Sequence, residues 1–160
     1  MRLKLLSVFL LGVLVATVGT AAADSPRNFR AHLNGAGAGV ESLGQGQAIF
    51  QFSEDGDMLH YKLIAANIDN IIMAHIHLAP APGQNGPPVL WLYPDGPPPV
   101  LIEGRFQGVL AERTVTAADL VGPLAGMTLE DLKTAIMDGL TYVNLHTQEF
   151  PGGEIRGDIH

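Results

Sequence analysis

The chain has 160 residues, 47% of them apolar, which is enough for one domain with a hydrophobic core and too few for two domains of ordinary size. It carries 16 Asp and Glu against nine Lys and Arg, a formal net charge of -7, and it has no basic cluster. Such a surface repels phosphate backbones, so we expect no nucleic-acid partner. The chain contains no cysteine, so it has neither disulfides nor thiolate ligands.

The N-terminal segment has the pattern of a secretory signal peptide, which we assign to residues 1–23. Arg2 and Lys4 form a positive head, and an apolar run is followed by three alanines before Asp24. We therefore expect a secreted or periplasmic protein that has no membrane attachment after cleavage. Loss of Arg2 and Lys4 leaves seven basic residues against 16 acidic ones, a net charge of -9. The alternative is an uncleaved anchor, because the weakly apolar stretch 5–23 approaches the roughly 20 residues that span a bilayer.

After a short linker at 24–27, one all-β domain is expected over 28–160. Its 19 glycines and 11 prolines fall mainly between short apolar runs, as is typical of many strands joined by turns. Asp55-Gly56-Asp57 between β-rich flanks predicts a hairpin. Strands are predicted in the segments NFRAHL, GQAIFQF, MLHYKLIAAN, NIIMAHIHL, PPVLWLY, GRFQGVLAERTVT, LTYVNLHT and GEIRGDI.

One segment has helical rather than strand character. Thr128 and Asp131 have the spacing of a capping box, and apolar residues recur at helical spacing after them. Gly139 is suited to the end of such a helix. We expect one short helix packed on a sheet, not a second domain.

Two histidines stand one residue apart in the segment MAHIHLAPAPGQNGPP. Side chains at i and i+2 of a strand share a face and lie about 7 Å apart, so His75 and His77 are neighbours. The alternating apolar residues around them are expected to face the core, which places both imidazoles on the opposite face. The same alternation in TYVNLHT places His146 on the non-core face of its strand.

If these two strands are close, His75, His77 and His146 converge on one ion. Three imidazoles at about 2.0–2.1 Å with a fourth position open are a zinc arrangement, and imidazole also suits copper. Glu154 on the last strand is a weaker candidate, either as a carboxylate ligand or as a partner that orients an imidazole. The alternatives are histidines that bind no metal, and a Glu154–Arg156 pair that fixes the strand register.

No residue is assigned a catalytic role. A zinc hydrolase needs a general base beside the metal-bound water, and Glu149 and Glu154 are the available candidates without a defined place. The remaining histidines, His32, His60 and His160, are expected on the surface.

Two blocks, AHIHLAPAPGQNGPPV and GLTYVNLHTQEFPGGEIRGDI, resemble the CHRD domain family, the chordin-type module that also occurs in secreted microbial proteins. The resemblance covers residues 28–160, although the early segment FRAHLNGAGAGVESLGQGQAIFQF departs from the family pattern. It implies an immunoglobulin-like or superoxide-dismutase-like antiparallel β-sandwich in an exported protein of no agreed catalytic activity. It also implies that His75, His77 and His146 lie in one place.

Three functions therefore stay open. The first is binding of copper or zinc through the histidine cluster. The second is an adhesion or protein-interaction module, with a protein partner or a second copy of the chain, in which the histidines are structural. The third is a redox enzyme with dismutase-like chemistry.

Overall fold

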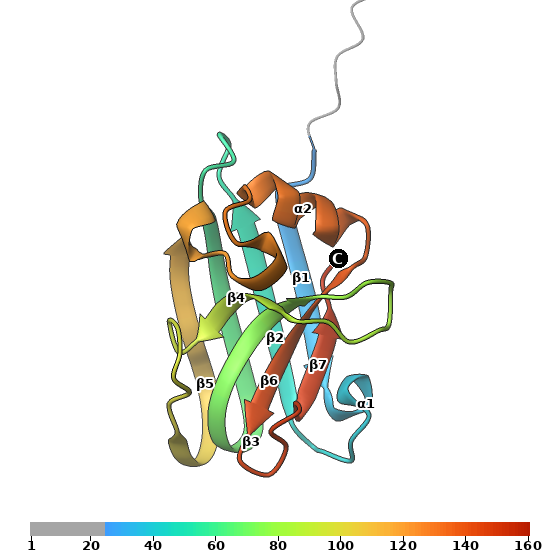
Figure 1. Cartoon of the computed structure of the whole chain (residues 1–160). Helices are drawn as coiled ribbons and strands as arrows, with labels where there is room; N and C mark the ends of the chain where they lie inside the picture. Colours follow the sequence, from blue (N-terminus) through green and yellow to red (C-terminus); the bar gives the residue numbers. More distant parts are fainter. Residues whose placement is uncertain (1–24) are drawn as a thin grey trace, which may run out of the picture.

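The computed structural model describes residues 25–160 (Figure 1). The predicted signal peptide lies outside these described residues. In chain order the elements are β1 (Asn28–Asn34), α1 (Gly35–Ala38), β2 (Gln45–Phe52), β3 (Leu59–Leu78), β4 (Pro88–Tyr93), β5 (Ile102–Val115), the 3₁₀ helices η1 (Ala117–Asp119) and η2 (Gly122–Leu124), α2 (Leu129–Met137), β6 (Thr141–Thr147) and β7 (Ile155–Asp158). Within residues 25–160, no helix has the length and apolar character needed to cross a bilayer.

The strands pair antiparallel throughout, which confirms the all-β class. Strands β1, β2, β3, β6 and β7 pair in turn, and β7 returns to β1, so that five strands close a barrel. Strands β4 and β5 pair with β3 outside this ring. The sandwich implied by the resemblance is not confirmed, because the pairing closes a ring and does not leave two separate sheets.

Strand β3 takes the place of two predicted strands. The sequence predicted a break before NIIMAHIHL, but the strand continues for 20 residues through Asn67 and Asn70. Both have positive φ, 57° and 53°, a conformation that asparagine tolerates better than most residues. The ladder with β5 shifts register in this region, so the strand bends there. The first half of β3 pairs with β2 and β5, and the second half pairs with β4 and β6 (Figure 1).

Residues 74–77 of β3 and all of β6 are buried on both faces. On the core face lie Ala74, Ile76, Val143 and Leu145, as the alternation predicted. Every residue of β6 is buried, including the polar ones that point away from the core. A second buried layer therefore lies on the far side of these two strands, and it carries the histidines.

Helix α2 begins as predicted. The Thr128 hydroxyl accepts from the Asp131 backbone N–H at 3.2 Å, and the Asp131 carboxylate accepts from the Thr128 backbone N–H at 2.8 Å. Gly139 follows the helix with φ of 69°. The single turn of α1 was not predicted. It forms because the Asn34 side chain accepts from the Gly37 N–H at 2.9 Å and caps an otherwise glycine-rich turn.

Candidate metal centre

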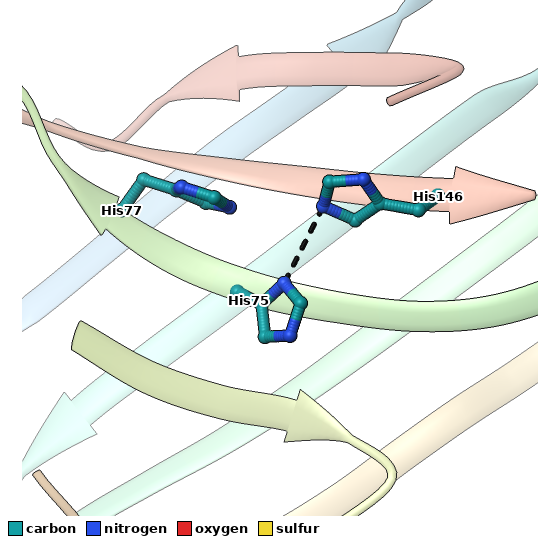
Figure 2. A group of neighbouring side chains, drawn as sticks. All are labelled: His75, His77 and His146. Atoms are coloured by element: carbon teal, nitrogen blue, oxygen red, sulfur yellow. Dashed lines mark hydrogen bonds between the residues drawn. The ribbon is translucent and has the colours of Figure 1, made fainter. Parts of the chain in front are cut away.

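Three histidines meet on the buried polar face of β3 and β6 (Figure 2). One ring nitrogen of each lies within 4.8 Å of the corresponding nitrogens of the other two. The strand register explains this meeting, since Asn144 is opposite His75 and His146 is therefore its diagonal neighbour. The structure thus brings together His75, His77 and His146, as the sequence predicted.

The cluster is shielded from solvent. His75, His77 and His146 are only 4%, 8% and 5% exposed. The Trp91 ring on β4 packs nearly perpendicular to the His75 ring, with 4.2 Å between their centroids. Alternation predicted these imidazoles on the non-core face, but it did not predict that β4 would cover that face.

Two backbone carbonyls orient two of the rings. His77 Nδ1–H donates to the Gly86 carbonyl at 2.8 Å, and His146 Nδ1–H donates to the Pro151 carbonyl at 2.9 Å. Because a carbonyl only accepts, both neutral rings keep their lone pair on Nε2. His77 Nε2 is buried without a hydrogen-bond partner, and Figure 2 shows this end of the ring directed toward the other two histidines.

The third ring approaches the others through its Nδ1. His75 Nδ1 lies 3.4 Å from His146 Nε2, which is longer than the usual range of about 2.7–3.2 Å for a hydrogen bond donated by N–H. Two nitrogens bound to a tetrahedral ion at about 2.0–2.1 Å lie about 3.3–3.4 Å apart. The separation therefore fits two ligands of one ion better than a hydrogen bond.

All three imidazoles are held neutral. Burial lowers the pKa of His75 to about 3, and the neighbouring imidazoles of His146 and His77 act in the same direction. Burial lowers the pKa of His77 to about 4 and also lowers the pKa of His146, although the carbonyls that accept from these two rings oppose the shift. Near neutral pH, each ring therefore offers a lone pair without first losing a proton.

The profile of the CHRD domain matches residues 29–159 of this sequence. The chain belongs to the CHRD domain family. The match spans all three histidines of the cluster and extends through the divergent early segment. No curated protein and no solved structure matches this chain.

In this CHRD domain, a stack of three side chains supports His77. The His77 ring lies nearly parallel to Tyr142, at 10° and with 4.9 Å between centroids. The Arg156 guanidinium lies 3.5 Å from the centre of the Tyr142 ring. Because β6 lies between β3 and β7, His77 and Arg156 approach Tyr142 from opposite sides, and this cation–π contact links β7 to the histidine face.

The loop 79–87 is attached to the same stack. Arg156 donates to the Asn85 side chain at 2.7 Å and to the Gln84 carbonyl at 3.0 Å. Gly86 supplies the carbonyl that holds His77, and a Cβ at this position would overlap the Leu78 carbonyl. A side chain at position 86 would therefore displace the loop from the site.

Glu154 lies apart from the histidines. Its Oε1 accepts a hydrogen bond from the Ser42 hydroxyl at 2.7 Å, and it is not part of the group of three ligand-bearing residues found within 25–160. The ion pair recorded for Arg156 is with Asp158, at 3.8 Å, so the predicted Glu154–Arg156 pair is not found among the described residues. The Glu154 carboxylate instead fastens the chain before β7 to the segment before β2.

Outside the cluster, the other histidines are on the surface, as predicted. His32 and His160 are exposed, and the exposed His60 lies 3.6 Å from Glu112. Asn144 and Tyr142 were not predicted as site residues, although the alternation that found His146 places both on its face of β6.

Proposed function

We propose that this CHRD-domain protein binds a transition metal ion, copper or zinc, through His75, His77 and His146. The observation that carries the proposal is the convergence of three buried, neutral imidazoles, in which the Nε2 of His77 faces the other two rings without a partner. A buried polar atom left unpaired costs about 1–3 kcal/mol, and rings placed to share an ion gain an interaction that offsets this cost.

The donor set restricts the class of metal. Calcium and magnesium prefer oxygen ligands, whereas the cluster offers three imidazole nitrogens. Imidazole suits copper and zinc, and the two carbonyls that fix the His77 and His146 rings are the kind of outer contact that orients metal-bound histidines. The signal-peptide pattern supports a secreted or periplasmic site of action, where such an ion would be met.

The interaction-module alternative explains the cluster less well. Histidines kept only for structure would each be expected to have both nitrogens satisfied, as other buried polar groups do. Here the burial of the face leaves His77 Nε2 unpaired and directed toward the other rings, and it places His75 Nδ1 3.4 Å from an acceptor nitrogen of His146.

Metal titration of the chain from Asp24 onward tests the proposal. Copper and zinc are each expected to raise the thermal unfolding midpoint, and an ion present at 100 times its Kd stabilises by about 2.7 kcal/mol. Magnesium is expected to have no effect. The chain contains one tryptophan, which packs on His75, so copper is also expected to quench Trp91 fluorescence as the site fills.

The double variant His75→Ala/His77→Ala is expected to abolish both responses. The matched control is His32→Ala/His60→Ala, which removes two exposed imidazoles and should leave both responses intact. An equal rise in the two double variants would show that the metal binds elsewhere and would favour the interaction module. A dismutation assay on the copper-loaded protein separates metal binding from dismutase-like chemistry.

A further inference from the structure

Unpaired buried atoms concentrate at the histidine face. Within residues 25–160, four buried side-chain atoms have no hydrogen-bond partner, and three of them belong to His75, His77 and Asn144. The unpaired atom of Asn144 is Oδ1, an acceptor, and the residue is only 7% exposed. Its Nδ2 donates to the Gly152 carbonyl at 3.0 Å, which fixes the orientation of the amide because the flipped form would oppose two oxygens.

The strand register places Asn144 beside the three rings. It is opposite His75 in the ladder and two residues before His146 on β6, so its side chain leaves the same face between them. Gly153 lies against the carboxamide so closely that a Cβ there would overlap it. The loop after β6 thus holds an unused acceptor next to the candidate ligands.

We infer that Asn144 Oδ1 accepts a hydrogen bond from a small protic ligand, water in the resting protein, that occupies the fourth coordination position of the ion. This inference rests on the proposed function. Three imidazoles leave one position of a tetrahedral ion open. An amide oxygen accepts hydrogen bonds and donates none, so it favours a ligand that carries hydrogen. Its lone pairs repel an anion that has no hydrogen to share.

Pulsed electron paramagnetic resonance of the copper(II)-loaded chain tests the inference. Comparison of spectra in H₂O and D₂O is expected to show exchangeable protons on a coordinated water in the unaltered protein. Azide, an anion without hydrogen, is expected to bind the copper weakly. Asn144→Leu has similar volume and removes the acceptor, so azide affinity is expected to rise about five- to tenfold, the effect of one lost hydrogen bond.

Asn28→Leu on β1 is the matched control, since it removes an exposed asparagine, and it should leave azide affinity unchanged. Copper binding without an exchangeable coordinated proton in the unaltered chain would overturn this inference and leave the proposed function standing. Direct ligation of the copper by Asn144 would remove the coordinated water and so would also overturn this inference. Failure of the unaltered chain to bind copper or zinc would overturn both. If Asn144→Leu does not fold, the absence of a coordinated exchangeable proton in the unaltered chain would still overturn the inference.

Discussion

The buried imidazoles of His75, His77 and His146 make the metal-free protein sensitive to acid. Their pKa values are lowered on folding, to about 3 for His75 and about 4 for His77, whereas unfolded histidine titrates near 6.5. Below pH of about 6.5 the unfolded chain therefore binds more protons than the folded one. The resulting stabilisation is complete above that pH and is lost as pH falls toward the folded values.

We predict that the metal-free chain loses stability between pH 7.5 and 4.5 more steeply than His75→Ala/His77→Ala. Each titrating histidine contributes a slope of up to about 1.4 kcal/mol per pH unit. Urea unfolding of both proteins at several pH values measures the difference, in which the carboxylates common to both cancel. Parallel curves would contradict the pKa shifts of these two histidines.

For single residues, the period-two alternation of apolar side chains was enough to predict which face of its strand each histidine of the cluster occupies. It did not identify the carbonyls of Gly86 and Pro151 as partners, because both lie in loops whose path is not encoded in an alternating pattern. Glu154 was predicted on the last strand, but β7 begins one residue later, at Ile155. Its contact with Ser42 joins segments far apart in sequence, which the local pattern does not report.

Among the elements, we expect the loop 79–87 to govern access to the proposed metal site. Its attachment to β7 depends on the two hydrogen bonds that Arg156 donates to Asn85 and Gln84. Hydrogen bonds from a charged group contribute about 1.5–3 kcal/mol, so their loss increases the population of the open loop at least about tenfold. Because the histidines are buried, an ion bound at the cluster would have to enter and leave through such openings.

Arg156→Met keeps most of the apolar length of the side chain and removes the guanidinium. We predict copper uptake and release at least about tenfold faster in this variant, followed by stopped-flow quenching of Trp91. Arg30→Met changes an exposed arginine on β1 and should leave both rates unchanged. Equal rates in all three proteins would show that the loop does not control access.

Helix α2 provides a test of local stability that is independent of the metal. Thr128→Ala removes the N-cap acceptor and is expected to lower the free energy of unfolding by about 1 kcal/mol. Thr134→Ala, at an exposed position within the helix, should be neutral or slightly stabilising. Urea unfolding measures both. The cap assignment would be contradicted if the two variants had the same stability.

Across the whole molecule, the barrel depends on the C-terminal residues. The backbone N–H and carbonyl of His160 bond the carbonyl and N–H of Arg30, each at 2.9 Å, and Ile159 is 1% exposed in the core. These contacts continue the antiparallel register of the pair Asn34–Arg156, which joins β1 and β7, four residues further along each segment. The closing seam therefore includes the residues beyond β7.

Deletion of Ile159 and His160 is expected to lower the free energy of unfolding by about 3 kcal/mol or more, since loss of a buried isoleucine side chain alone costs about 2–5 kcal/mol. His160→Ala retains the backbone bonds and should have little effect. Denaturant unfolding compares the two. An unchanged stability after the deletion would contradict a closed seam at β1.

The topology was beyond what the sequence could predict. The all-β class, the hairpin at Gly56 and the capped helix at Thr128 follow from local patterns and were predicted. Ring closure depends on pairings between distant segments, which alternation does not specify. The single long β3 was missed because Asn67 and Asn70 look like the end of a strand, whereas their positive φ values bend one that continues.

X-ray absorption spectroscopy of the chain loaded with one equivalent of zinc or copper tests the central claim most directly. The account predicts scattering from three imidazole rings, with nitrogen at about 2.0–2.1 Å from zinc. In His75→Ala/His77→Ala the ion should be lost or should retain no more than one imidazole. An ion bound mainly by oxygen in the unaltered chain, or one whose environment is the same in the double variant, would contradict a metal site at this cluster.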